Sequence, residues 1–185
     1  FFSQAGELWR RNPLLQLLRE TLGDGFGLVR GLYFDKPPER SWSLPWHKDL
    51  TIAVQRNDLA STHFTNPTQK AGVAHVEASR AVLESMLTLR IHLDAVTDEN
   101  GPLVVIPGSH QNGKKSVESD RGMRKILVAA GDVLAIRPLL SHCSGNSQPG
   151  TTRHRRILHL EFAANRELPE GYRWHTFQSP DEKIG

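Results

Sequence analysis

The sequence has 185 residues, of which 38% are hydrophobic and 23% are charged, and its formal net charge is +3. This length suits one domain with one sizeable core, so we predict a single domain over residues 1–185, and the spread of lysine and arginine among acids argues against a nucleic-acid-binding protein. No apolar run approaches the length that crosses a bilayer and no signal peptide is evident, so we expect no membrane association. The single cysteine, Cys143, excludes an intramolecular disulfide and favours a reducing cytoplasm.

The first element that the sequence predicts is an amphipathic helix. It begins near Asn12-Pro13, with Asn12 as the N-cap and Pro13 in the first turn, and it ends at Gly23-Asp24-Gly25. Leucines recur along it at helical spacing, so we expect one apolar face that packs on the outside of the core.

The rest of the chain has the pattern of short strands separated by turns. Residues 56–80 are polar and irregular, which predicts a long loop and makes this segment our candidate for a lid. Many short strands beside one helix predict a mainly β fold, either a β-sandwich or a jelly roll, with its core at about residues 28–163. Strands are expected at residues 28–34, 47–55, 87–95, 103–106, 123–129, 133–136, 139–142 and 155–163.

His47 and Asp49 form a candidate metal-binding pair. In an extended strand, residues two apart project to the same side, so these side chains share a face and Lys48 points away. An imidazole and a carboxylate can occupy two positions on an octahedral ion, and a further histidine completes the 2-His-1-carboxylate arrangement of non-haem Fe(II) oxygenases. The pattern is weak in a chain with nine histidines, and the ordinary alternative is solvated side chains on a half-buried strand. A second pair, His92 and Asp94, has the same spacing.

Two later segments could complete such a site. His142 follows His47 by 95 positions (142 − 47 = 95), and strands that are distant in sequence become neighbours in a jelly roll. Arg155 lies in the last strand, on the face opposite to its apolar side chains. An arginine that faces a metal is suited to bidentate binding of a carboxylate, and Arg153, two residues earlier on the same face, is the alternative.

Several short motifs therefore occur in a fixed order between residues 28 and 163. They are Trp46-His47-Lys48-Asp49, Glu99-Asn100-Gly101-Pro102-Leu103, Ile106-Pro107-Gly108-Ser109-His110, Gly131-Asp132-Val133, His142 and Arg155-Arg156. This ordered set resembles the phytanoyl-CoA dioxygenase family of Fe(II)- and 2-oxoglutarate-dependent oxygenases. The resemblance implies a double-stranded β-helix, a cupin-like jelly roll, with the N-terminal helix at its flank. It also implies an enzyme that uses Fe(II), 2-oxoglutarate and O2 to hydroxylate a small-molecule or acyl substrate, with release of succinate and CO2.

Position by position, the resemblance implies that the iron ligands are His47, Asp49 and His142. It implies that Arg155 binds the distal carboxylate of 2-oxoglutarate and that Ser144 hydrogen-bonds to the same cosubstrate. The complete triad favours hydroxylation, because related halogenases have a small residue in place of the carboxylate.

Other positions follow from the same resemblance with a less defined role. Leu32 matches an apolar position that lines the cosubstrate site, and the backbone of Lys48 is a further candidate contact. Arg90 stands where many relatives have tryptophan beside the cosubstrate, so it is either a second carboxylate contact or a substrate contact. Trp46 and His92 are candidate substrate residues, although Trp46 could equally pack beneath the site.

Three alternatives remain open. If His92 and Asp94 were the ligand pair, the Asn-Gly-Pro-Leu turn would follow almost at once and leave too few strands before His142, so this pair is disfavoured. The chain could instead be a non-catalytic jelly-roll protein that binds a metal or ligand without turnover. A nucleic-acid-binding β-barrel would show a steep loss of binding with salt.

Overall fold

The computed structural model describes residues 7–116 and 122–182. Residues 1–6, 117–121 and 183–185, which the predicted single domain includes, lie outside the described residues. The described residues form two compact units. The first contains those at positions 7–30, 51–87 and 161–182, and the second those at positions 31–50, 88–116 and 122–160. In the described part of the chain, no helix has the length and apolar character needed to cross a membrane.

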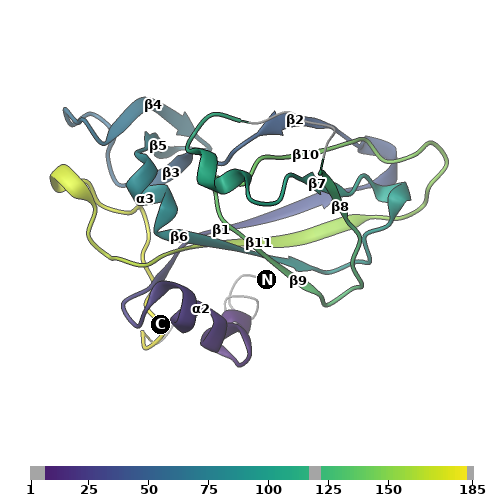
Figure 1. The fold of residues 1–185 in the computed structure, drawn as a ribbon, viewed down its shortest axis with the longest axis horizontal. Coiled ribbons are helices and arrows are strands. Elements are labelled where there is room, and N and C mark those ends of the chain that lie inside the picture. The colour runs from purple at the N-terminus through teal and green to yellow at the C-terminus, as the bar shows by residue number, and fades with distance from the viewer. Residues whose placement is uncertain (1–6, 117–121, 183–185) are drawn as a thin grey trace. The chain divides into compact units, whose positions relative to one another are not determined.

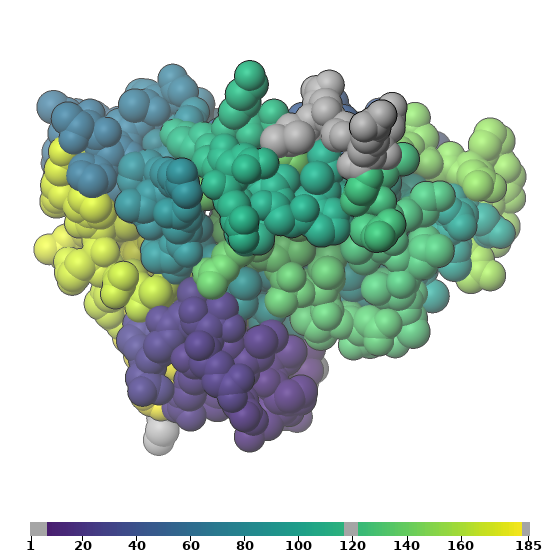
Figure 2. All heavy atoms as spheres, viewed as in Figure 1, coloured from purple at the N-terminus to yellow at the C-terminus, as the bar shows by residue number. Residues whose placement is uncertain are grey.

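The first unit contains the predicted N-terminal helix. Helix α2 spans Leu14–Leu22 and buries Leu18, and the short 3-10 helix η1 (Leu8–Arg10) before it buries Trp9. The two helices lie together at the surface (Figure 2), as expected for an element that covers a core from outside. The expectation that Asn12 caps the helix was wrong, because Pro13 itself occupies the cap position with helical dihedral angles and no side chain caps the helix.

The ring of Trp9 connects these helices to the core of the first unit. Its centroid lies 5.8 Å from that of Phe26 and 5.3 Å from that of Phe162, both in edge-to-face geometry. Such pairs of buried aromatic rings contribute about 0.5–1.5 kcal/mol each beyond the burial of their area. The core of this unit therefore includes an aromatic cluster that joins segments distant in sequence.

A three-stranded antiparallel sheet fills most of the segment that we expected to be an irregular lid loop. Its order is β3 (Thr51–Val54), β5 (Val73–Ala78) and β4 (Phe64–Lys70), followed by a short helix α3 (Arg80–Glu84) that the sequence did not predict. The expectation of a structureless loop over residues 56–80 was therefore wrong. Strand β4 is exposed along nearly all its length, so its sequence lacks the alternation of apolar and polar residues that predicts a strand. Its register with β5 also shifts between Thr65 and Thr68.

The second unit is built from strands of two four-stranded sheets. The first sheet has the order β1 (Gly27–Lys36), β11 (Arg155–Ala163), β6 (Met86–His92) and β9 (Val133–Ile136). The second has the order β2 (Leu44–His47), β10 (His142–Ser144), β7 (Leu103–Val105) and β8 (Arg124–Ile126). Strands β1, β6 and β11 also contribute residues to the first unit. Non-consecutive neighbours such as β2 and β10 are what a jelly roll requires.

A hydrophobic cluster inside the second unit joins the two sheets. Leu103 and Val105 of β7 pack with Ile136 of β9 and with Leu140. Figure 1 shows the strands of the two sheets and the small amount of helix among the described residues. The mainly β fold and the flanking N-terminal helix are thus confirmed.

Two predicted strands have different boundaries in the structure. The expected strand at residues 47–55 is interrupted, since β2 ends at His47 and β3 begins at Thr51. The expected strand at 139–142 is shifted, since β10 begins at His142. The other 3-10 helices are η2 (Pro38–Arg40), η3 (Asp98–Asn100), η4 (Ser109–Asn112) and η5 (Pro169–Gly171).

Candidate metal centre

The two histidines expected as ligands face each other across paired strands of the second unit. Strand β2 pairs antiparallel with β10, and His142 lies directly opposite His47 in the register. Their ring centroids are 4.2 Å apart. The long sequence separation between the two residues is therefore bridged by one step across a sheet.

Backbone carbonyls fix the orientation of both imidazole rings. Nδ1 of His47 lies 2.7 Å from the carbonyl oxygen of Pro45, and Nδ1 of His142 lies 2.9 Å from that of Leu140. A carbonyl only accepts hydrogen bonds, so each Nδ1 carries the proton and each Nε2 keeps its lone pair for a ligand bond. Burial lowers the pKa of His142, which favours the neutral ring that a metal requires.

Asp49 completes a cluster of three potential metal ligands. Its carboxylate oxygens lie 3.9 Å from Nε2 of His47 and 3.7 Å from Nε2 of His142. Ligand atoms in neighbouring octahedral positions, each about 2.1 Å from the ion, lie about 3.0 Å apart, so these side chains would approach one another by roughly 1 Å on binding a shared ion. Across residues 7–116 and 122–182, this is the one group of three or more His, Cys, Asp or Glu side chains with ligand atoms close enough to hold a metal, all within 4.8 Å of one another.

The position of Asp49 has a different origin from the one we expected. Asp49 lies in the break between β2 and β3, and its backbone N–H donates to the carbonyl oxygen of Pro138 at 2.9 Å. The assumption that one continuous strand carries His47 and Asp49 was therefore wrong. The two side chains converge because the segment that precedes β10 holds the backbone of Asp49.

The alternative ligand pair, His92 and Asp94, makes hydrogen bonds to groups outside the candidate metal centre. The carboxylate of Asp94 binds Arg156 in a bidentate ion pair, with Nη2 to Oδ1 at 2.6 Å and Nε to Oδ2 at 2.9 Å. His92 is buried, and its Nδ1 lies 3.2 Å from the carbonyl oxygen of Asp132. Burial lowers the pKa of His92. Asp94 is thus committed to a surface arginine, and His92 lies on the same face of β6 as Arg90.

A second set of polar side chains lies on one face of the β1-β11-β6-β9 sheet. Arg90 of β6 donates from Nη1 to Nδ1 of His159 in β11 at 3.0 Å, and Phe34 of β1 packs edge-on against His159 with ring centroids 5.6 Å apart. Alternate residues of a strand share a face, so Lys36 of β1 and Arg155 of β11 project to this same side. All three cationic residues are buried. We call Lys36, Arg90 and Arg155 the cationic cluster.

The charges of the cationic cluster act on one another. Burial, together with the charges of Arg155 and Arg90, lowers the pKa of Lys36 to about 7. Burial and the charge of Arg90 lower the pKa of Arg155 to about 10. Burial also lowers the pKa of Arg90, while the charge of Asp49 acts in the opposite direction. Arg90 is therefore within electrostatic range of Asp49 and His142, two of the candidate metal ligands.

Several donors beside the cationic cluster have no acceptor. In the described part of the chain, Nε of Arg90, Nε of Arg155 and Oγ of Ser144 are buried without a hydrogen-bond partner, and neither arginine forms an ion pair with a carboxylate. A buried polar group without a partner costs free energy, and such groups mark places where a ligand supplies the missing partner. Buried guanidinium donors without an acceptor fit an anion such as the distal carboxylate of 2-oxoglutarate.

Other residues named from the sequence lie near the candidate site with distinct contacts. Lys48 is buried, and its Nζ donates to the carbonyl oxygens of Ser109 and Gly113 at 2.7 Å each, so its side chain holds the η4 segment. Leu32 lies on the same face of β1 as Lys36 and is half-buried. Trp46 is half-buried and precedes His47 in β2, so it projects to the other side of that strand.

The turn at η3 braces the strand that carries Arg155. The amide nitrogen of the fully buried Asn100 donates to the carbonyl oxygens of Ala95 and His154 at 2.9 and 3.0 Å, and its oxygen accepts from the N–H of Thr97. His154 immediately precedes Arg155. Asn100 therefore fixes the start of β11, a role that the sequence did not indicate beyond its turn motif.

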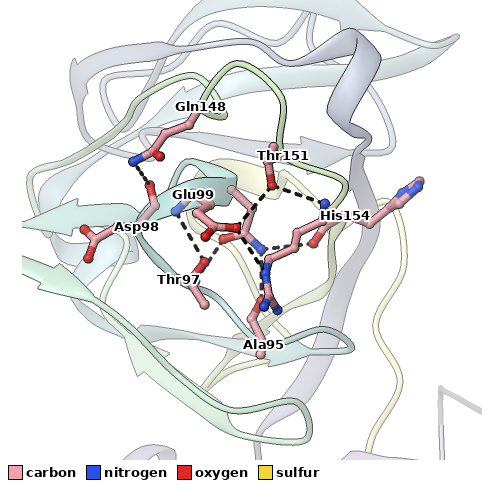
Figure 3. Close-up of polar contacts among 9 residues, drawn as sticks. Ala95, Thr97, Asp98, Glu99, Gln148, Thr151 and His154 are labelled. Carbon is pink, nitrogen blue, oxygen red and sulfur yellow. Dashed lines mark hydrogen bonds and ion pairs between the residues drawn. The ribbon is translucent and has the colours of Figure 1, made fainter.

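Glu99, in the same η3 turn, binds Arg153, the alternative candidate for the carboxylate anchor. Oε2 of Glu99 accepts from Nε of Arg153 at 3.1 Å and from the hydroxyl of Thr151 at 3.4 Å, and Gln148 donates to the backbone of Asp98 (Figure 3). Arg153 is exposed. The contacts of Arg153 are thus those of a surface ion pair, which favours Arg155 as the cosubstrate anchor.

Two residues of the site were missed by sequence reasoning. The sequence around Lys36 predicts only that a strand ends before Pro37 and Pro38. No local pattern indicates that the ammonium group of Lys36 is buried. His159 was placed on the polar face of the last strand but had no role. The one available signal was its alternation with Arg155, which places both on the face that also receives Arg90.

Comparison with known proteins bears directly on this arrangement. Residues 11–155 match the family described as Phytanoyl-CoA dioxygenase (PhyH), which covers most of the chain and includes both histidines and the aspartate of the cluster. The chain belongs to the phytanoyl-CoA dioxygenase family. This confirms the family that the ordered motifs suggested.

One curated protein that is similar to this chain is a probable alpha-ketoglutarate-dependent hypophosphite dioxygenase from Stutzerimonas stutzeri. The two sequences are 26% identical over 111 residues, which is 60% of this chain but only 29% of the relative. The chain thus spans less than a third of that protein.

Solved structures with the same fold include a nickel complex of the non-haem monooxygenase ThoJ, with a TM-score of 0.62, 18% identity, and coverage of 87% of this chain and 54% of ThoJ. EctD from S. alaskensis has a TM-score of 0.61 and 22% identity, with coverage of 88% and 54%. HygX from Streptomyces hygroscopicus, with nickel and 2-oxoglutarate bound, has a TM-score of 0.57 and 16% identity, with coverage of 86% and 64%. At these identities the likeness shows the fold, and it confirms the cupin-like jelly roll.

Proposed function

We propose that the chain is an Fe(II)- and 2-oxoglutarate-dependent dioxygenase that hydroxylates a small-molecule or acyl substrate. The observation that carries this proposal is the cluster of Nε2 of His47, Nε2 of His142 and the carboxylate of Asp49, with both Nδ1 atoms already bonded to backbone carbonyls. Two neutral imidazoles and one carboxylate are the donor set of the 2-His-1-carboxylate iron site. Family membership supports the same reading.

The residues around the cluster fit the cosubstrate as well as the metal. Arg155 is buried, carries an Nε without an acceptor and belongs to a face with excess positive charge, so it would bind the distal carboxylate of 2-oxoglutarate. The unpartnered hydroxyl of Ser144 would donate a further hydrogen bond to the same molecule. Leu32 and the backbone of Lys48 would contribute contacts of lesser weight.

The protein's own residues would bind, orient and exclude water. When bound, iron and 2-oxoglutarate supply the reduction of O2, with one oxygen atom incorporated into succinate as CO2 is released and the other into the substrate. The carbonyls of Pro45 and Leu140 hold the imidazoles in the ligating tautomer, and the pairing of β2 with β10 sets their separation. Burial of Arg155 and Ser144 removes competing water from the carboxylate, which strengthens its hydrogen bonds.

The small-molecule substrate is part of the proposal, and the curated relative named for hypophosphite supports that size class. Trp46 and His92 remain candidate substrate residues. The cytoplasmic location expected from the single cysteine also remains a prediction.

Release of succinate from 2-oxoglutarate tests the proposed activity. The chain would be incubated aerobically with Fe(II), ascorbate and 2-oxoglutarate, and succinate would be quantified with and without candidate substrates. We expect slow succinate formation without substrate that depends on Fe(II) and is absent in His47→Ala. Metal binding without any succinate, under conditions where the protein remains folded, would favour the non-catalytic binding protein.

A further inference from the structure

The cationic cluster holds more positive charge than the proposed iron and 2-oxoglutarate chemistry can neutralise. Arg90 and Arg155 are both buried, and neither forms an ion pair with any carboxylate among the described residues. With Fe(II) bound, the two charges of the metal and the one of Arg155 are balanced by Asp49 and by the doubly negative 2-oxoglutarate. The charge of Arg90 then stays uncompensated, and a buried charge without a partner is strongly unfavourable.

The guanidinium of Arg90 is held so that one edge is available to bind an anion. Nη1 is committed to Nδ1 of His159, whose ring is in turn packed against Phe34. Among the described residues, neither Nε nor Nη2 of Arg90 has a hydrogen-bond acceptor. Arg156 of the same chain shows what this edge does when a carboxylate is present, since its Nε and Nη2 bind the two oxygens of Asp94 at 2.9 and 2.6 Å. Arg90 thus presents the bidentate edge of an arginine without its anion.

We propose that the substrate of this site carries an oxyanionic group, a carboxylate or a phosphorus oxyanion, and that the Nε and Nη2 edge of Arg90 binds it. The inference rests on the proposed function and adds the chemical class of the substrate. Arg90 lies in β6 next to β11, and its charge acts on Asp49 and His142, so an anion on it is held within electrostatic range of these two ligands. The protonated form of Lys36 adds positive charge on the same face, which strengthens the preference for an anion over a neutral group.

An alternative role for Arg90 would make an anionic substrate unnecessary. If Arg90 and Arg155 both bound the distal carboxylate of 2-oxoglutarate, the cosubstrate would neutralise both guanidinium groups in part, and no second anion would be needed. The two arrangements differ in which ligand loses affinity when Arg90 is replaced.

Anaerobic spectroscopy of the complete chain separates the two arrangements. The charge-transfer band of the Fe(II)–2-oxoglutarate chelate would be recorded at saturating 2-oxoglutarate during titration with acetate, phosphite or neutral acetamide, with chloride keeping the ionic strength constant. We expect acetate or phosphite to shift the band saturably and acetamide to leave it unchanged. In Arg90→Gln the anion response should weaken at least 10-fold, whereas half-saturation by 2-oxoglutarate should rise far more in Arg155→Gln than in Arg90→Gln. Arg90→Lys, which keeps the charge but not the edge, should bind the anion with intermediate affinity.

Two controls make the result decisive. Arg153→Gln removes an exposed arginine that is paired with Glu99 and should match the wild type in every titration. Anaerobic thermal melting of the protein loaded with Fe(II) and saturating 2-oxoglutarate, which occupies Arg155, provides a second readout. Acetate should stabilise the wild type more than acetamide does, and Arg90→Gln should lose that difference.

The possible failures are distinguishable. No chelate band with folded, metal-loaded protein would contradict the proposed function itself and this inference with it. A normal band that no anion perturbs, or an Arg90→Gln variant that loses 2-oxoglutarate as severely as Arg155→Gln does, would overturn only the anionic substrate.

Discussion

The second unit contains two polar regions, the metal-ligand cluster of His47, Asp49 and His142 and the cationic cluster. They differ in how many of their hydrogen-bonding groups have partners before a ligand binds. In the metal-ligand cluster, each imidazole already donates Nδ1 to a backbone carbonyl, and the three side chains converge from β2, β10 and the break that follows β2. In the cationic cluster, Arg90 and Arg155 are buried with unmatched Nε atoms, and the pKa of Lys36 falls to about 7.

This difference indicates that one region is organised to bind a metal ion and the other to bind an anion. The metal-ligand cluster is pre-organised by local backbone contacts, so its geometry costs little to maintain. The cationic cluster places like charges together, which costs stability and leaves donors unsatisfied until an anion binds. We therefore expect replacements in the first region to abolish metal binding and replacements in the second to alter anion binding and stability.

The largest effect is expected from loss of a histidine in the metal-ligand cluster. His142→Ala removes one of three ligand groups and should lower Fe(II) affinity by roughly 100-fold or more, since even changes in outer contacts cost about 10–100-fold. Isothermal titration under anaerobic conditions measures this directly. His154→Ala, an exposed histidine paired with Asp35, should bind the metal as the wild type does. Equal affinities in all three proteins would exclude His142 as a ligand.

Arg155→Gln should have the next largest effect, on the cosubstrate and not on the metal. Loss of one partner of a buried charge-assisted hydrogen bond costs about 3 kcal/mol, so half-saturation by 2-oxoglutarate should rise roughly 100-fold. The matched variant is Arg153→Gln, whose exposed ion pair with Glu99 contributes little. If Arg153→Gln were the variant that lost 2-oxoglutarate, the alternative anchor would be correct.

Gly101→Ala tests the brace beside the cationic cluster. Gly101 has a φ of +66° in the turn after Asn100, and an added Cβ would lie 2.5 Å from the carbonyl oxygen of Gly145, which accepts from Lys36. Gly150 has a φ of +80° with open space around it, so Gly150→Ala incurs only the cost of the left-handed backbone, about 1–2 kcal/mol.

Chemical denaturation of these two glycine variants should separate the two costs. Gly101→Ala should lose a further roughly 1–3 kcal/mol of unfolding free energy, because overpacking adds to the backbone strain. Equal losses in both variants would mean that the contact between the turn and Gly145 is not tight.

The effect of Lys36→Met on the unfolding free energy is expected to depend on pH. The folded pKa of Lys36, about 7, lies below the ordinary lysine value of 10.5, so between these values the unfolded chain binds more protons at this residue. The unfolding free energy of the wild type should therefore rise with pH from about 7 to about 10, relative to the variant, by up to about 1.4 kcal/mol per pH unit. Below pH 7 both states are protonated and the difference between the proteins should be constant.

Urea denaturation at several pH values compares the two profiles. Lys70→Met, which replaces an exposed lysine, should give a profile parallel to that of the wild type. Parallel profiles for Lys36→Met as well would show that Lys36 titrates normally in the folded protein.

The sequence was sufficient for the fold and the family because both depend on residue types in a fixed order. His47, Asp49 and His142 could be grouped by their chemistry and by the rule that a jelly roll brings distant strands together. The local argument for Asp49 was wrong, because its position depends on a hydrogen bond to Pro138, 89 positions away (138 − 49 = 89), and alternation within one strand does not describe such a contact.

The remaining misses have similar physical causes. The hairpin of β4 and β5 was read as a loop because β4 is polar and exposed, so strand pairing and not an apolar face defines it. Lys36 contacts the carbonyl oxygen of Gly145 and the ring of Trp42, which approach it only in the folded unit. Charge imbalance is a property of the assembled face and cannot be read from any one segment.

The central claim is that one metal ion and one 2-oxoglutarate bind together at the metal-ligand cluster and Arg155. It is tested most directly by anaerobic titration of the complete chain with Fe(II) and 2-oxoglutarate, while the weak visible charge-transfer band of the chelate is recorded. The account predicts a band in the wild type, no band in His47→Ala, and a band in Arg155→Ala that requires far more 2-oxoglutarate. No band in folded, metal-loaded wild-type protein would contradict it.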